Sequence, residues 1–228
     1  KGVEGIKNLA KEYNGSFNSN KYLKWLIGNS GDINITDYIS ENTNQVDFSN
    51  FNLKELPTGK NILAEGGEFY FCPKDKLLFS GINRNTIAGA EYVASFLNAN
   101  ELILIDTPSF HLDTVFTTVF DKQGALSAMI VCKELITKDS FKNLEKISIK
   151  LNVHIIIIPA KDSIGTDSQL GSLAVNSFCA PGLLLSSSNY SDFSVGKKLE
   201  SLGIKTEVCP VSQFQLSGGS VHCLTNEL

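Results

Sequence analysis

Three residue types in this chain could together form an activated-thiol catalyst. Cys223 lies near the C-terminus, His111 near the middle, and Glu65 directly before two glycines. A cysteine thiolate is a nucleophile, and a histidine side chain can hold or release a proton near neutral pH. A carboxylate can orient the imidazole, which completes the set needed for covalent catalysis. The three residues are far apart in the sequence, so only folding can bring them together.

The elements that must position these residues follow a repeated β-β-α-β order from residue 61 onward. Alternating and helical hydrophobic spacing, broken by turn residues, predicts three such units. The predicted elements are strands 62–71 and 77–82, helix 86–97, strand 102–105; strands 111–120 and 126–131, helix 141–151, strand 153–158; strands 173–178 and 183–186, helix 195–202, strand 204–209. A fourth unit opens at Gly218 and contains one predicted strand, which carries Cys223.

The first strands of the units recur at intervals of roughly 50 residues, which is typical of a repeat or propeller-like array. Glu65, His111 and Cys223 all lie at or near the first strand of a unit. In a radial array the first strands line the axis. The repeat therefore predicts that the three side chains meet at the centre.

The composition predicts one folded domain. The chain has 228 residues, of which 42% are hydrophobic and 19% charged, so it can bury a core. Residues 1–60 are rich in asparagine and serine, and no motif can be placed in them. We expect a single catalytic domain over residues 1–228, with a poorly readable head at 1–60 and recognisable repeats at 61–228.

The charge and hydropathy narrow the choice of partner. The net charge of -4 and the isoelectric point of 5.4 argue against binding to nucleic acid or to an anionic membrane. No apolar run reaches the ~18 residues of a membrane span, and no signal peptide opens the chain. These features predict a cytoplasmic protein and leave open a homo-oligomer.

The cysteine and histidine patterns refine this prediction. Five cysteines without a Cys-x-x-Cys pair indicate reduced thiols, and four of them are predicted to be structural: Cys72, Cys132, Cys179 and Cys209. Three scattered histidines predict no metal site. His222 adjoins Cys223, but neighbouring residues of a strand point to opposite faces, so His111 is the better candidate base. His154 opens an isoleucine run and is predicted to be structural.

Three short motifs occur in order along residues 61–228. They are Glu65-Gly66-Gly67 followed by Glu68, His111-Leu112-Asp113-Thr114-Val115-Phe116-Thr117, and Gly218-Gly219-x-x-His222-Cys223-x-Thr225. Together they resemble the guanidino-group-modifying enzymes with the five-bladed α/β-propeller (pentein) fold, which include arginine deiminase, dimethylarginine dimethylaminohydrolase and the amidinotransferases. The second motif is most similar to arginine deiminase.

The resemblance implies a role for each residue. Cys223 would attack the guanidinium carbon and form a thiouronium adduct. His111 would protonate the leaving amine and then activate water. Glu65 would orient His111 and contact the guanidinium, and Asp113 would accept guanidinium N–H bonds. The implied enzyme is a hydrolase of C–N bonds in a small guanidino compound such as arginine, and it needs no cofactor and no metal.

The chain departs from the pattern of this family in two places. No Arg-Asp or similar acidic motif precedes Glu65, so the first propeller unit is either missing or divergent. The segment Gly81-Ile82-Asn83-Arg84-Asn85-Thr86 also carries its arginine one place earlier than the family's Gly-x-Ser-x-Arg-Thr. Arg84 is the only arginine in the chain, and we predict that it holds the substrate's α-carboxylate.

Two alternatives to the hydrolase remain open. An amidinotransferase would form the same intermediate, which an amine rather than water would resolve. A non-catalytic relative would bind a ligand or partner through the same fold. Retention of a thiol and a base together favours an enzyme over a binding protein.

Overall fold

The structure is a computed structural model that describes residues 62–166 and 168–225. All of them belong to one compact unit, Leu56–Leu228. The predicted head, and with it the question of the first propeller unit, lies outside the described residues. The prediction of one domain over the whole chain therefore stays a prediction.

Three β-β-α-β units follow one another in the described part. The first consists of β1, β2, α4 and β3, at Phe69–Cys72, Leu77–Gly81, Ile87–Phe96 and Glu101–Ile105. The second consists of β4, β5, α5 and β6, at Phe116–Phe120, Leu126–Val131, Lys138–Leu151 and His154–Ile157. The third consists of β9, β10, α6 and β11, at Phe178–Ala180, Leu183–Ser186, Phe193–Ser201 and Lys205–Val208.

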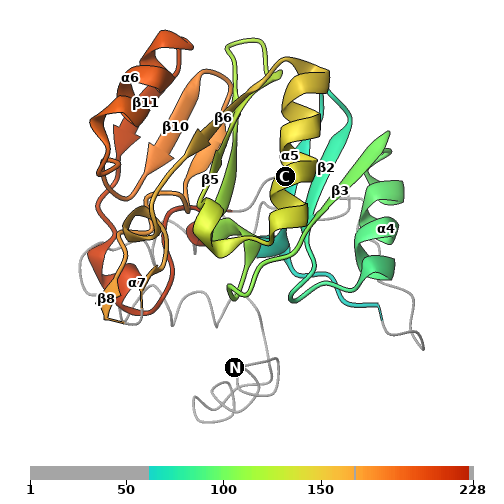
Figure 1. The fold of residues 1–228 in the computed structure, drawn as a ribbon, viewed down its shortest axis with the longest axis horizontal. Helices are drawn as coiled ribbons and strands as arrows, with labels where there is room; N and C mark the ends of the chain where they lie inside the picture. The colour runs from blue at the N-terminus through green and yellow to red at the C-terminus, as the bar shows by residue number, and fades with distance from the viewer. Residues whose placement is uncertain (1–61, 167, 226–228) are drawn as a thin grey trace, which may run out of the picture. The chain divides into compact units, whose positions relative to one another are not determined.

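Each unit forms its own small sheet with the same topology. The first two strands pair antiparallel, and the third strand pairs parallel to the second after a helical crossover. A two-stranded ribbon of β7 and β8 and the short helix α7 complete the described strands and helices, at Gly165–Thr166, Gln169–Leu170 and Ser212–Leu216. The mixed α/β class and the β-β-α-β order are therefore as the sequence predicted (Figure 1).

Local signals in the sequence set the limits of the helices. Thr86 and Thr137 each accept a backbone N–H of the first turn, which caps α4 and α5 at their N-termini. Helix α5 ends at Asn152, whose left-handed backbone (φ 54°) closes the helix. Gly203, with φ of 75°, has the same function after α6, as the sequence predicted. None of the helices in the described part is both long and apolar enough to cross a membrane.

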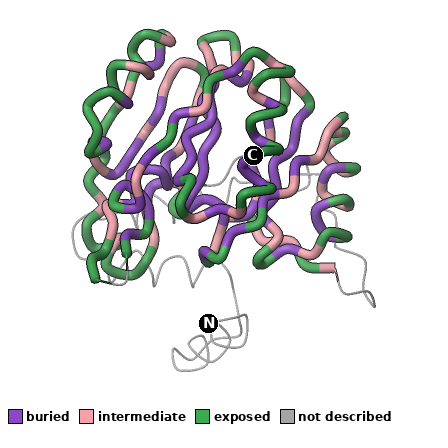
Figure 2. The backbone as a smooth tube through the Cα atoms, in the orientation of Figure 1, coloured by how far each residue is buried: buried purple, intermediate pink, exposed green. Residues whose placement is uncertain are grey.

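The core lies between the sheets and their helices. Every residue of β2 and of β4 is buried, and Figure 2 shows these strands in purple with the outer helix faces in green. Helix α5 packs on β6 of its own unit and on β3 of the preceding unit, and so joins the two (Figure 1). Its buried side chains Phe141, Leu144 and Ile147 recur every three residues, as one helix face requires.

Short 3-10 segments replace predicted strands at three places. They are η3, η4 and η7, at Gly66–Glu68, Leu112–Thr114 and His222–Leu224. The strands predicted to begin at residues 62 and 111 begin at Phe69 and Phe116, and no strand forms between Gly218 and Thr225, the last residue that the structure describes. The strand predicted at 173–178 is likewise absent, and β9 begins at Phe178. Two more 3-10 segments, η5 and η6, occur at Lys133–Leu135 and Ala160–Asp162.

The backbone hydrogen bonds explain why these strand predictions were wrong. The N–H of Leu112 donates to the Glu68 carboxylate at 2.9 Å, and the N–H of His222 donates to the carbonyl of Asn176 at 3.2 Å. These groups are therefore satisfied without a strand ladder. Gly218 adopts φ of 82°, which turns the chain just where a strand was predicted to start.

Candidate active site

The three 3-10 segments surround one cavity of about 330 Å³. Its lining residues come from η3 and β1, from η4 and the residue before it, and from the C-terminal turn: Gly66, Gly67, Phe69, His111, Asp113, His222, Cys223 and Thr225. The structure thus brings together His111, Asp113 and Cys223, although Asp113 and Cys223 are 110 residues apart in sequence. Glu65 and Arg84 lie behind His111 and do not line the cavity.

Glu65 holds the imidazole of His111. Its Oε2 lies 2.8 Å from Nε2 of His111. This hydrogen bond from His111 is the main reason that the pKa of Glu65 is below its usual value, and Arg84 lowers it further against the opposing effect of burial. An ionised carboxylate can only accept, so Nε2 carries the proton of this pair. Nδ1 is then the nitrogen that can exchange a proton with a ligand.

Gly67 packs closely against Nδ1 of His111. A Cβ atom added to Gly67 would lie 2.7 Å from Nδ1 of His111 and 3.1 Å from Oδ2 of Asp113. Only a residue without a side chain can approach both groups so closely. The double glycine of the first motif therefore allows the loop to pack against the predicted base and the predicted guanidinium acceptor.

Arg84 contacts Glu65 rather than the cavity. Its Nη2 lies 3.1 Å from Oε1 of Glu65, its Nε lies 3.4 Å from Oε2, and its guanidinium is 4.8 Å from the centre of the Phe110 ring. The side chains of Arg84 and Glu65 are 44% and 38% exposed, so this ion pair contributes little to stability. Its evident effect is to hold Glu65 against His111.

Asp113 is a buried carboxylate with one oxygen in use. Its side chain is 2% exposed, and Oδ2 lies 3.0 Å from Nδ1 of His222 and 3.5 Å from Sγ of Cys223. Its other oxygen, Oδ1, is buried without a hydrogen-bond partner among the described residues. Such an oxygen is costly to bury, and its enclosure leaves Oδ2 as the oxygen that faces the cavity-lining residues Gly67, His222 and Cys223.

Asn176 holds Cys223 in place, and the sequence analysis missed it. Its Nδ2 lies 3.2 Å from Sγ of Cys223 and 3.2 Å from the carbonyl of Asp113, and its Oδ1 accepts the N–H of Cys223 at 3.3 Å. Asn176 is fully buried. It follows an apolar run that resembles a strand, and no spacing in the sequence marks it as part of a site.

The thiol of Cys223 is partly enclosed although the residue as a whole is exposed. Burial raises the pKa of this thiol above its usual value, and the negative charge of Asp113 raises it further. The isolated site therefore favours the thiol over the thiolate. A cation bound beside Asp113 would reverse this preference.

Glu68 connects the segments around the site. It is fully buried, and its carboxylate accepts the N–H of Arg84 at 2.8 Å and that of Leu112 at 2.9 Å. Burial raises its pKa, and these two hydrogen bonds oppose the effect. A Cβ added to Gly81 would lie 1.7 Å from Oε2 of Glu68, so the glycine at the end of β2 makes room for this carboxylate.

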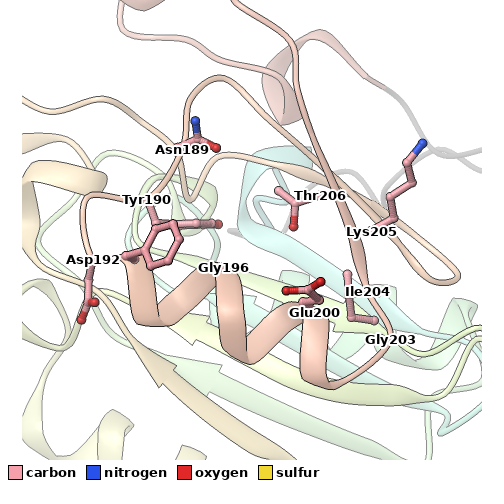
Figure 3. Close-up of a pocket in the computed structure, with 10 residues that line it drawn as sticks. Asn189, Tyr190, Asp192, Gly196, Glu200, Gly203, Ile204, Lys205 and Thr206 are labelled. Carbon is pink, nitrogen blue, oxygen red and sulfur yellow. The ribbon is translucent and has the colours of Figure 1, made fainter.

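A larger hollow of about 650 Å³ lies elsewhere, between α6 and β11 (Figure 3). Tyr190 and Glu200 are among its lining residues, and its described lining contains no cysteine or histidine. Volume alone would favour this hollow. The chemistry favours the smaller cavity as a candidate site, because a thiol, an imidazole and a carboxylate meet there.

The remaining cysteines differ in accessibility. Cys72, Cys132 and Cys179 are buried, whereas Cys209 is exposed, and none of the five forms a disulfide. Burial raises the pKa of Cys132. Among the described residues, no three side chains of the types that bind metals gather at one place.

No protein-family model matches the chain, and none of the curated proteins does. Solved structures are similar in fold. A cysteine-to-serine variant of the N-terminal domain of ArgZ, a cyanobacterial arginine dihydrolase, bound to its substrate, is 20% identical with a TM-score of 0.62 over 85% of this chain and 65% of that one. A cysteine-to-alanine variant of AgrE with L-arginine is 19% identical with a TM-score of 0.60 over 84% of this chain and 26% of that one.

An amidinotransferase also has a similar structure. SxtG from Microseira wollei, of the saxitoxin biosynthetic pathway, is 17% identical with a TM-score of 0.51 over 76% of this chain and 50% of that one. The chain spans at most 65% of the length of these structures. At this level of identity the likeness concerns the fold. The described part of the chain therefore shares its fold with these arginine dihydrolases and with SxtG, as the resemblance of its three motifs implied.

Proposed function

We propose that this chain cleaves a C–N bond of a small guanidino compound, arginine or a close relative, through a covalent adduct on Cys223. One observation carries the proposal. Cys223, Asp113 and the Glu65–His111 pair meet around one cavity on a fold shared with arginine dihydrolases. A structure of the N-terminal domain of ArgZ contains a covalently bound reaction intermediate, which supports covalent chemistry on this fold.

The buried carboxylate suggests how the substrate binds. A guanidinium group carries several N–H donors in one plane and matches a carboxylate. A guanidinium would donate to Oδ2 of Asp113, which lies among the cavity-lining residues Gly67, His222 and Cys223. Its positive charge would also offset the negative charge that raises the pKa of the Cys223 thiol. Substrate binding would thereby help to form the nucleophile.

The chemical steps then need one acid and one base. The thiol of Cys223 first gives its proton to Nδ1 of His111. Sγ then forms a bond to the guanidinium carbon, the C–N bond breaks, and the leaving amine takes that proton from Nδ1. The same nitrogen next removes a proton from water, whose oxygen bonds to the carbon of the adduct while the C–S bond breaks, and the sulfur recovers a proton. Glu65 holds Nε2 throughout, so Nδ1 of His111 serves both steps.

The proposal extends to parts of the fold beyond the described residues. We place the three units as blades of a pentein-type propeller, in which the first strands surround the site. The family's acid in an early unit would have its counterpart, if any, in the head of this chain. We also place the enzyme in the cytoplasm, which the lack of disulfides among its five cysteines supports.

A mass-spectrometric product screen tests this function. The full chain is incubated with arginine, methylated arginines, agmatine and citrulline, with and without an acceptor amine. We expect turnover of arginine or a methylated arginine in water alone. No product from any compound, under conditions in which the thiol of Cys223 is intact, would contradict the proposal and favour a non-catalytic binding protein.

An amidinotransferase is the second candidate, and the structural likeness of this chain to SxtG supports it. The same site would form the same adduct, and an amine would resolve it in place of water. The acceptor arm of the screen separates the two: transfer of the amidino group that depends on the added amine identifies a transferase, and product without it identifies a hydrolase.

Asp113→Asn is expected to weaken binding of arginine strongly. The amide keeps the shape but removes the charge that faces the guanidinium, and breaking a buried charged pair costs roughly 3–5 kcal/mol, or a factor of about a hundred to several thousand. Calorimetric titration of the Cys223→Ala background with arginine measures this without turnover. An unchanged affinity would mean that Asp113 does not contact the guanidinium.

Arg84→Lys is expected to slow turnover of both arginine and agmatine, and to slow arginine by ~10-fold more. The common loss arises because lysine cannot form the two contacts of Arg84 with Glu65. The additional loss arises if Arg84 also binds the α-carboxylate, which agmatine lacks. Steady-state kinetics with both substrates measure the two losses. Equal losses would remove the carboxylate contact and leave only the support of Glu65.

A further inference from the structure

A second imidazole–carboxylate pair lies on the C-terminal side of the cavity. Nδ1 of His222 is 3.0 Å from Oδ2 of Asp113, and the two side chains are 14% and 2% exposed. The His222 ring stacks on Tyr70, with centres 4.8 Å apart and planes 28° apart. Its backbone N–H donates to the carbonyl of Asn176. The ring is therefore held on its face, at its Nδ1 and through its backbone.

His222 lies beside Cys223 at the cavity. In the strand predicted there the two side chains would point to opposite faces, but both residues lie in the 3-10 segment η7 and both line the cavity. A carboxylate only accepts, so Nδ1 of His222 carries the proton that Asp113 accepts. This nitrogen is therefore committed to Asp113, as Nε2 of His111 is committed to Glu65.

We propose that His222 is a positioning residue for Asp113: its N–H holds Oδ2 among the cavity-lining groups and thereby fixes the carboxylate toward the substrate's guanidinium. This inference rests on the function proposed above. Without the imidazole, Oδ2 would lose its donor at 3.0 Å and retain only the weaker thiol contact at 3.5 Å. The carboxylate could then rotate, and the guanidinium would lose its fixed partner.

The same hydrogen bond also affects the nucleophile. The S–H of Cys223 and the N–H of His222 share Oδ2 as acceptor. When His222 donates, it withdraws part of the negative charge that would otherwise hold the thiol proton. Among the other titratable groups of the facing segments, His111 lines the cavity with the thiol. Glu65 and Glu68 do not line it, because Glu65 bonds to His111 and Glu68 to the backbone of Leu112. Removal of His222 therefore leaves Asp113 as the closest charge acting on the sulfur.

Three variants distinguish a positioning role of His222 from a purely structural role. His222→Phe keeps a ring that can stack on Tyr70 but has no donor, whereas His222→Asn places an amide N–H close to the position of Nδ1. His154→Phe is the matched control, because His154 is exposed on β6 and is not among the residues that line the cavity. The first readout is the pH dependence of Cys223 alkylation by iodoacetamide without substrate, read by peptide mass spectrometry. The second is kcat and KM for arginine.

We expect His222→Phe to move the alkylation midpoint to higher pH and to raise KM by ~10-fold or more, the size of a lost charge-assisted hydrogen bond. His222→Asn should restore most of both, and His154→Phe should change neither. An unshifted midpoint with an unchanged KM in His222→Phe overturns the proposal. Equal defects in the Phe and Asn variants also overturn it, because the donor would then not matter.

One further measurement covers the case in which the His222→Phe variant fails. If His222→Phe does not fold, nitrogen-15 spectra of the wild-type histidines replace it, assigned by the signals lost in His222→Asn. A protonated Nδ1 supports the proposal, and an unprotonated Nδ1 overturns it. The alkylation profile needs no substrate, so failure of every guanidino compound in the product screen would reject the proposed function and leave the coupling of His222, Asp113 and Cys223 separately measurable.

Discussion

Cys223→Ala is expected to abolish turnover and leave the fold intact. The variant removes the sulfur that forms the covalent bond, and Cys223 is the one cysteine among the described residues that line the cavity with His111 and Asp113. The loss of stability should be small, because Cys223 is exposed in a short 3-10 segment and is not part of the core. Product formation measures the first effect and thermal unfolding the second. Cys209→Ala is the matched control, since Cys209 is the other exposed cysteine, and it should retain full activity.

The thiol itself gives an independent check. A chloroacetamidine-type electrophile carries the same amidinium group as the substrate and should label Cys223 ahead of the other cysteines. Because burial and Asp113 raise the pKa of Cys223, neutral alkylating agents should react fully only at a pH above the ordinary cysteine range of about 8.5. Labelling of Cys72 or Cys209 first, with Cys223 untouched, would remove Cys223 as the nucleophile.

His111→Ala is expected to cost several orders of magnitude in rate. General acid–base catalysis by a positioned side chain contributes roughly 10²–10⁴-fold, and His111 would act in both the formation and the hydrolysis of the adduct. Glu65→Gln should cost less, because an amide oxygen can still accept from Nε2 but no longer stabilises a protonated ring. Steady-state kcat of the three proteins measures the order, wild type above Glu65→Gln above His111→Ala.

The control for His111 is His154→Ala, which changes a histidine outside the cavity lining and should have no effect. Trapping of the adduct by acid quench shows which step suffers. Accumulation of adduct in His111→Ala would place the larger defect in hydrolysis, and its absence would place it in formation. Near-normal turnover of His111→Ala would mean that the base lies elsewhere, with His222 as the next candidate.

The sequence predictions were accurate where the structure is set by interactions between residues close together in the chain. Helix α5 was predicted over 141–151 because its spacing of apolar residues is local, and the structure begins it three residues earlier, at Lys138 after the cap Thr137. The turn after α6 was predicted because a glycine just past a helix suits a left-handed backbone. The strands β5 and β10 have the predicted limits, because alternation and turn residues are local signals too.

The segments that form the site were predicted less well, for a physical reason. Residues 111–115 and 221–224 have strand-like composition, but the backbone N–H groups of Leu112, His222 and Cys223 bond to partners elsewhere in the chain. Other N–H groups of these segments close 3-10 turns within them. Leu112 bonds to Glu68 across 44 residues, and Cys223 bonds to Asn176 across 47. Local strand propensity takes no account of such a distant partner, so a strand was predicted where a turn forms.

The amino-acid sequence by itself determined the types and order of the reactive residues, the three motifs and the repeating units that carry them. Only the tertiary structure decided which groups touch. It paired Arg84 with Glu65, placed Asn176 on Cys223, and turned His222 toward Asp113. These contacts are hydrogen bonds between polar groups buried or half-buried at long sequence separation, where a donor must have an acceptor and only the packed chain determines which one is near.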